Sequence, residues 1–144
     1  MSSGIKIADE VKETYQQISM TSTKSTKLKY CILKFSDDSK RIIVEKSASA
    51  EEDSDYDTII SGLPPKDVRY LAYDFEFVNK DGTKKSEMIL VSWHPETSPI
   101  KQKMLCASSF NALKSCLSVS KNVIEGSCFE EVSSAAVLEK LRRN

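Results

Sequence analysis

The residues best suited to binding chemistry are Lys101, Lys103 and Met104, which lie in the segment from Trp93 to Leu117. At about 100° per residue of a helix, Lys101 and Met104 fall on the stripe opposite the apolar one, whereas Lys103 lies nearer to the apolar stripe. A flexible, polarisable methionine beside cations on a solvent face is typical of a protein-binding surface. A single exposed methionine without function is also common. The spacing alone leaves both interpretations open.

Histidine and cysteine, the usual residues of catalysis and metal binding, show no spacing of that kind. The single histidine, His94, has no cysteine or histidine at metal-ligand spacing beside it, which disfavours a metal ligand or a general base. The cysteines form no C-x-x-C pair and three lie in apolar segments, so buried reduced thiols are the favoured interpretation. They are Cys31, Cys106, Cys116 and Cys128. An unrecognised thiol enzyme stays open as an alternative.

Acidic and glycine-containing segments do not match the common ligand-binding loops. The acidic run from Glu51 to Asp57 lacks the glycine and the terminal glutamate of an EF-hand loop, so a solvated loop is expected. No G-x-G-x-x-G or G-x-x-x-x-G-K-[ST] motif occurs, and the chain has only 4 glycines. The sequence therefore predicts no metal site, no cofactor and no enzymatic activity.

Length and composition predict one compact domain. The chain has 144 residues, of which 40% are hydrophobic and 29% charged, enough for a sizeable core. Its 21 basic residues balance 21 acidic ones, so no overall field favours nucleic acid or a membrane. Basic residues still cluster locally, and a surface that gathered them would favour an acidic protein or anionic lipid head groups. The clusters contain Lys84, Lys85, Lys101, Lys103, Lys140, Arg142 and Arg143.

Targeting and membrane-spanning patterns are not visible in the chain. The first residues lack a basic segment followed by an apolar run, and no apolar stretch approaches the roughly 18 residues that span a bilayer. From the sequence we expect a soluble, intracellular protein.

The candidate residues must be positioned by a mixture of helices and strands. Cys106, Phe110 and Leu113 share one stripe of a helix, and Pro99 marks its start because proline has a fixed φ and no N–H. The patterns predict strands at 28–35, 41–45, 68–78, 85–93 and 123–125, and helices that begin at Asp9, before Ile59, after Pro99 and after Ser133 or Ser134. This order predicts the α/β (α+β) class, with a central mixed sheet and helices on both faces.

Two of these elements carry more specific predictions. Ser54 and Asp57 form a Ser-x-x-Asp capping signature at the start of the short second helix. Asp74 and Glu76 alternate with aromatic residues, which predicts a hairpin that projects past the sheet with one side in water. At the turn of this hairpin, Gly82 can adopt a positive φ.

Four motifs, in sequence order, closely resemble the actin-depolymerising factor and cofilin family: SSGIKIADE, YDFEF, W-x-P-E-T-S-P and K-x-K-M-L-C-A-S-S. The resemblance covers nearly the whole chain. It implies a single ADF-homology domain at 1–144 with the gelsolin-like fold, a five- or six-stranded sheet flanked by helices, and a flexible N-terminal arm at 1–6. It further implies a protein that binds actin monomers, preferring ADP-actin, binds filaments, and promotes severing, depolymerisation and turnover without being an enzyme.

The resemblance also implies which residues contact actin. Position by position, the family's monomer-and-filament site corresponds to Ser3, Gly4, Ile5, Lys101, Lys103 and Met104. The filament-specific site, on the projecting hairpin and the last helix, corresponds to Lys84, Lys85, Glu139, Lys140 and Arg143. Glu87 departs from the family, which often has a basic residue at this position. The filament site therefore matches the family less closely than the monomer site does.

Regulation and partners follow from the same resemblance. Ser3, next to Ser2, corresponds to the family's inhibitory phosphorylation site, which implies a regulatory kinase and phosphatase. The expected partners are G-actin and F-actin, phosphoinositides at the membrane surface are a further candidate, and no nucleic acid is expected. We expect a cytoplasmic monomer at the actin cytoskeleton. Nuclear entry stays open because the lysines of 23–30 are dispersed.

An alternative function exists within the same fold. A monomer-sequestering or non-severing module with weak filament binding would be similar to coactosin or to glia maturation factor. The retained monomer-binding motif argues against this alternative, but these residues do not fix the balance between severing and sequestering.

Overall fold

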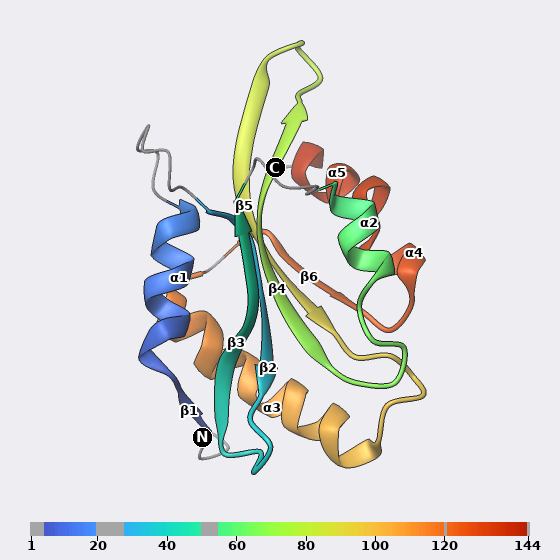
Figure 1. The fold of residues 1–144 in the computed structure, drawn as a ribbon. Coiled ribbons are helices and arrows are strands. Elements are labelled where there is room, and N and C mark those ends of the chain that lie inside the picture. The colour runs from blue at the N-terminus through green and yellow to red at the C-terminus, as the bar shows by residue number, and fades with distance from the viewer. Residues whose placement is uncertain (1–4, 20–27, 50–54, 120, 144) are drawn as a thin grey trace.

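Six strands and five helices make up the part of the chain that the computed structural model describes, residues 5–19, 28–49, 55–119 and 121–143 (Figure 1). The strands are β1 (Lys6–Ile7), β2 (Leu28–Phe35), β3 (Arg41–Ser49), β4 (Arg69–Val78), β5 (Lys84–Trp93) and β6 (Val123–Gly126). The helices are α1 (Asp9–Ser19), α2 (Tyr56–Ser61), α3 (Ile100–Leu117), α4 (Phe129–Val132) and α5 (Ser134–Arg143). The predicted residues Ser3, Gly4 and Ser54 lie outside the described residues, as does the side chain of Arg143.

The strands form one mixed sheet in the order β1-β3-β2-β4-β5-β6, which confirms the predicted architecture with six strands. The three central pairings are antiparallel, whereas β1 pairs with β3, and β5 with β6, in parallel. The sequence does not reveal β1, because two residues carry no periodicity. Its geometry comes from the pairing of Lys6 with Arg41 and of Ile7 with Ile42. The segment expected as an arm, 1–6, thus reaches into the sheet at Lys6.

Two hydrophobic clusters lie on opposite faces of this sheet. Successive residues of a strand point to opposite faces, so Tyr70 packs with α1 and α3, whereas its neighbour Leu71 packs with α2, α4 and α5. Figure 1 shows the same division of the helices between the two faces. The double coverage explains the unbroken apolar tracts of β4 and β5, as predicted. None of the described helices combines the length and the apolar composition that a membrane crossing requires.

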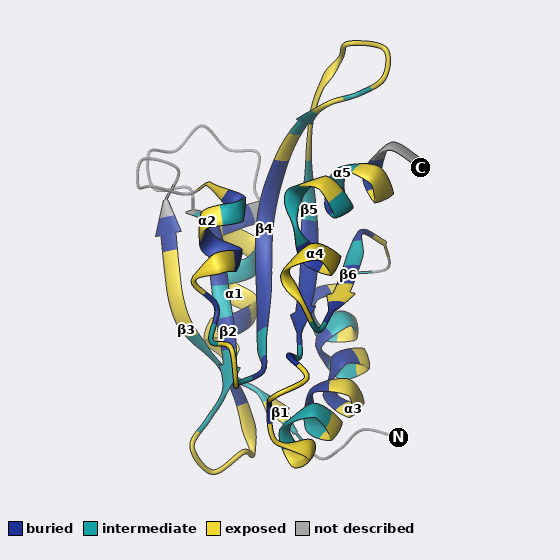
Figure 2. Ribbon diagram, turned by 90° about the vertical axis from the view of Figure 1, so that its right-hand side faces the viewer, coloured by how far each residue is buried: buried dark blue, intermediate teal, exposed yellow. Residues whose placement is uncertain are grey.

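The β4–β5 hairpin projects past the sheet, as predicted (Figures 1 and 2). Among the described strands, β2 pairs with β4 only at 70–73 and β6 with β5 only at 90–93, so the outer part of the hairpin has no further strand beside it. Gly82 closes its turn with a φ of 86°. Asp74, predicted to face water, is instead only 7% exposed and accepts a hydrogen bond from Ser86. A hydroxyl on the paired strand satisfies the carboxylate, and alternation along one strand cannot show such a partner.

The start of α2 also differs from the prediction. Its N-cap is Asp55, whose carboxylate accepts a hydrogen bond from the backbone N–H of Thr58 at 3.2 Å. Asp57, expected to complete a local capping box, instead binds Ser134 at the start of α5, 77 residues along the chain. Local spacing cannot reveal a partner at that distance. Neither α4 nor the part of β3 beyond Glu45 is predicted from the sequence.

Gly126, at the end of β6, lies directly against α4. A Cβ atom there would lie 2.6 Å from Val132 Cγ1 and 2.8 Å from Glu131 Cβ. We expect Gly126→Ala to lower the free energy of unfolding by about 1–3 kcal/mol, because α4 must shift to make room. Urea denaturation would measure this change. Gly62→Ala is the control, since the nearest atom to its Cβ lies at 3.5 Å, and equal unfolding midpoints for both variants would contradict the close packing at Gly126.

Candidate functional site

Two apolar side chains stand in solvent at the first turn of α3. Met104 is 66% exposed, as the helical stripe predicts, and Ile100 is 71% exposed. The two residues are four apart and therefore neighbours on one side of the helix, with the exposed Lys101 next to Ile100 in the chain. Sequence reasoning missed Ile100, although its spacing from Met104 is a signal that could have revealed it. Ile100, Lys101 and Met104 are called the α3 patch below, and they fit a partner surface that is apolar and acidic.

The opposite side of α3 is fixed to the sheet. Cys106, Phe110 and Leu113 are buried, as predicted. The hydroxyl of Tyr70 on β4 donates a 2.6 Å hydrogen bond to the carbonyl of Cys106, and its ring stacks on Phe110 with the centroids 5.6 Å apart. Burial raises the pKa of Tyr70 above its ordinary value, so the phenol stays the neutral donor that this bond needs. The α3 patch is therefore carried by an anchored helix.

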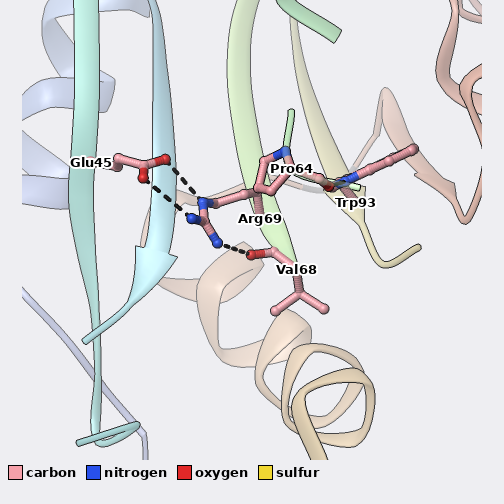
Figure 3. A network of polar contacts seen from close by, with 5 residues as sticks. All are labelled: Glu45, Pro64, Val68, Arg69 and Trp93. Carbon is pink, nitrogen blue, oxygen red and sulfur yellow. Dashed lines mark hydrogen bonds and ion pairs between the residues drawn. The ribbon is translucent and has the colours of Figure 1, made fainter. Parts of the chain in front are cut away.

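The loop that leads into α3 is tied to the segment after α2. The indole N–H of Trp93, at the end of β5, donates to the carbonyl of Pro64 at 2.8 Å (Figure 3). The hydroxyl of Thr97 donates to the carbonyl of Pro65 at 2.6 Å. These two bonds fix the path of the chain just before α3 begins.

A bidentate ion pair orients the start of β4 (Figure 3). Arg69 Nε and Nη2 donate to the two carboxylate oxygens of Glu45 on β3 at 2.9 and 3.3 Å. Arg69 Nη1 donates to the carbonyl of Val68 at 2.8 Å. The pair crosses β2, which lies between β3 and β4. Its geometry is specific, although pairs of this exposure typically contribute only about 0–1 kcal/mol to stability.

Lys103 points away from the α3 patch. Its ammonium group donates a 3.0 Å hydrogen bond to the carbonyl of Glu96, and the residue is half-buried. This agrees with its predicted position near the apolar stripe. Lys101 is exposed. The structure therefore brings Lys101 and Met104 together and turns Lys103 toward the loop before the helix.

Ile5 is the described part of the predicted N-terminal contact. It is half-buried and packs against the cluster that α1 and α3 cover. Figures 1 and 2 both place β1, which follows Ile5, at the same end of the sheet as the first turn of α3. Ile5 and the α3 patch thus belong to one end of the molecule.

The predicted hairpin contact lies at the opposite end (Figures 1 and 2). Lys84 and Lys85 are exposed on β5 near the turn. They help to line a groove of about 380 Å³ whose other walls are Glu76, Phe77, Val78 and Ser86. Val78 is 46% exposed. Lys85 is paired with Phe77 and Lys84 with Val78, so the hairpin offers one cation beside an apolar residue on each face.

Glu87 does not project with these lysines. It lies nearer the base of the hairpin, paired with Phe75 on β4, and is half-buried. The side-chain amide of the buried Asn122 donates to its carboxylate at 2.9 Å. Glu87, where the resemblance leads us to expect a basic residue, thus lies at the junction between β5 and β6, not at the tip of the hairpin.

α5 lies beside the same hairpin (Figure 1). Leu138 of α5 and Phe77 of the hairpin pack against one cluster. The ammonium group of Lys140 donates a 2.7 Å hydrogen bond to the carbonyl of Val123, and Glu139 is exposed. The four described residues that the resemblance assigned to this end are called the hairpin–α5 surface below: Lys84, Lys85, Glu139 and Lys140.

The thiol environments offer no activated nucleophile in the core. Cys31 and Cys106 are buried, and burial raises the pKa of Cys31 to about 12 and that of Cys106 above its ordinary value. Cys116 is half-buried, and Cys128 is exposed just before α4. The expected burial therefore holds only for Cys31 and Cys106. All four are free. Within the described ranges, no three His, Cys, Asp or Glu residues gather where they could hold a metal ion.

Known proteins match this chain over nearly its whole length. The family model described as cofilin/tropomyosin-type actin-binding protein matches residues 4–142. A cofilin from Schizosaccharomyces pombe is 36% identical over 141 residues, which cover 98% of this chain and 97% of the relative. A cofilin from Kluyveromyces lactis is 38% identical over 143 residues, which cover 98% and 94%. The crystal structure of a Streptomyces griseoflavus cofilin is similar with a TM-score of 0.83 at 34% identity, covering 98% of this chain and 99% of that one.

Proposed function

The chain belongs to the family of cofilin/tropomyosin-type actin-binding proteins, and we propose that it binds actin monomers with a preference for ADP-actin, binds filaments, and promotes their severing and turnover. The observation that best supports this proposal is the α3 patch, an exposed apolar pair beside a lysine on an anchored helix. Preformed surfaces of this kind supply binding energy through a few central side chains. The proposed activity needs binding alone, without a catalytic group.

We assign the two ends of the molecule to two contacts. The monomer contact combines the α3 patch with Ser3, Gly4, Ile5 and Lys103. The filament-specific contact combines the hairpin–α5 surface with Arg143. The separation of the two groups along the sheet supports this assignment, because a filament offers two neighbouring subunits where a monomer offers one.

Co-sedimentation with actin filaments tests the function. With pellet and supernatant both assayed over a range of concentrations, we expect the protein in the pellet and additional actin in the supernatant. Additional supernatant actin without pelleted protein would favour the monomer-sequestering alternative. Pelleted protein without additional supernatant actin would favour a non-severing filament binder. No change in either fraction would contradict actin binding.

Phosphorylation of Ser3 is expected to weaken actin binding. The phosphate adds about −1.5 to −2 charges, and a surface that attracts Lys101 is acidic and would repel it. Ser3→Asp carries less charge and should cause a partial loss, whereas Ser3→Ala should bind normally and escape the kinase. Titration of ADP-actin monomers with each protein measures the dissociation constants.

Salt dependence and a neighbouring serine supply the controls for Ser3. Exposed charges are screened by salt, so the ratio of the Ser3→Asp and wild-type dissociation constants should approach one as ionic strength rises. Ser2→Asp places the same charge one residue earlier and should have the smaller effect. Full binding by protein stoichiometrically phosphorylated at Ser3 would make Ser2 the next candidate.

The proposed setting is the cytoplasm, where the protein acts as a monomer on the actin cytoskeleton under the control of a kinase, a phosphatase and phosphoinositides. An open groove of about 710 Å³ between α3, β6 and α5 supports the proposed control by phosphoinositides. Its lining includes Lys114, Lys121 and Lys140, and a basic lining suits a phosphorylated head group.

A further inference from the structure

α5 begins on a carboxylate that another helix supplies. Asp57 of α2 accepts a 2.8 Å hydrogen bond from the backbone N–H of Ser134 and, through its second oxygen, a 2.6 Å bond from the Ser134 hydroxyl. The first N–H groups of a helix have no partner within the helix, and a negative charge is favourable at this end. Asp57 thus satisfies a donor that α5 cannot satisfy itself, and both residues are half-buried.

Other contacts at the same corner leave Asp57 as the main polar anchor of the first turn. The hydroxyl of Tyr56 donates a buried 2.6 Å bond to the carbonyl of Val132, two residues before α5, and burial raises the pKa of Tyr56 so that it stays a donor. The hydroxyl of Ser133, one of the two predicted caps, accepts a hydrogen bond from the backbone N–H of Ala136 over 3.4 Å. That distance is beyond the usual range for a strong bond. α2 therefore supplies polar contacts at the start of α5, in addition to the core packing of Val137.

The far end of α5 is held as well. Leu141 is buried, and Lys140 binds the carbonyl of Val123. Leu138 of α5 packs against the same cluster as Phe77 of the hairpin, and α5 also carries Glu139 and Lys140. A change in direction at Ser134 would displace both relative to Lys84 and Lys85.

We propose that Asp57 is a positioning residue for filament binding, which acts by fixing the start of α5 and thereby the geometry of the hairpin–α5 surface. This inference rests on the proposed function. Asp57 does not belong to the surface itself. The α3 patch lies at the other end of the molecule, on a helix that packs against the other cluster, so the monomer contact does not depend on Asp57.

Three variants separate positioning from stability. Asp57→Ala removes both acceptors and should weaken filament co-sedimentation by roughly fivefold to tenfold, with the ADP-actin monomer dissociation constant within about twofold of wild type. Asp57→Asn keeps one acceptor without the charge, and its filament affinity should fall between those of wild type and Asp57→Ala. Asp55→Ala is the matched control, since it removes the cap of α2 but keeps the Asp57 carboxylate that Ser134 binds, and it should bind filaments as wild type does.

Hydrogen exchange provides a readout that needs no actin. In Asp57→Ala the backbone amides of 134–137 should exchange faster than in Asp55→Ala, with the amides of α3 unchanged. If wild type binds filaments and Asp57→Ala binds them equally well, or loses monomer binding to the same degree, the positioning role is overturned while the proposed function stands. If wild type itself fails to bind filaments, the proposed function fails, and unchanged exchange at the start of α5 would then overturn the positioning role separately.

Discussion

Replacing Lys101 and Met104 together by alanine is expected to weaken the complex with ADP-actin monomers by about 100-fold, or roughly 3 kcal/mol. Met104 would lose the apolar contact of a 66%-exposed side chain, and Lys101 its attraction to an acidic partner. Both side chains stand in solvent, so truncation opens no cavity and the free energy of unfolding should stay within about 0.5 kcal/mol of wild type. Titration of labelled ADP-actin measures the affinity.

Two further variants make this result specific to the α3 patch. Lys12→Ala removes an exposed lysine from α1 and should leave the dissociation constant unchanged. Lys103→Ala should have an intermediate effect, because its ammonium group holds the carbonyl of Glu96 and so supports the loop before α3. Wild-type affinity in a folded Lys101→Ala/Met104→Ala protein would remove the α3 patch from the monomer contact.

Reversing Lys84 and Lys85 to glutamate is expected to weaken filament binding by at least roughly 50-fold, with the loss of severing. The two lysines stand on a hairpin that extends beyond the sheet, each paired with an apolar residue of β4, where only the second subunit of a filament would reach them. The monomer dissociation constant should change by less than about twofold. Co-sedimentation and microscopy of single filaments measure binding and severing.

A variant of equal charge controls for the general effect of added negative charge. Lys12→Glu/Lys46→Glu changes the net charge by the same amount at exposed positions on α1 and β3, and it should retain filament binding. Wild-type filament binding should also weaken with ionic strength, since exposed charges are screened. Equal losses of monomer and filament binding in Lys84→Glu/Lys85→Glu would mean that the hairpin is not a separate filament contact.

Sequence reasoning succeeds here wherever the signal repeats along one element. The 3.6-residue period of α3 predicts both the burial of Phe110 and the exposure of Met104, and the unbroken apolar tracts of β4 and β5 predict a sheet covered on both faces. The projecting hairpin follows from alternation and from Gly82. These patterns are local, and several residues of the same element support each one.

Sequence reasoning fails where a residue depends on one distant partner. Asp57 looks like part of a local cap but binds Ser134, and Asp74 looks solvated but is buried against Ser86. The two residues of β1 become a strand only because β3 lies beside them. A period cannot encode a single contact between segments far apart in the chain, and much of the candidate filament surface depends on such contacts.

The place of α3 between β5 and β6 has a consequence for how the two ends respond to a partner. These strands are parallel, so α3 is the crossover that joins them, and opening it would detach β6 and expose a core cluster. Its amides should therefore open only when the whole domain unfolds, whereas the outer hairpin can fray locally. The entropic cost of ordering the protein on binding should then come mainly from the hairpin. In the proposed complexes, the α3 end would therefore meet actin as a rigid surface, whereas the hairpin could adjust to the neighbouring subunit.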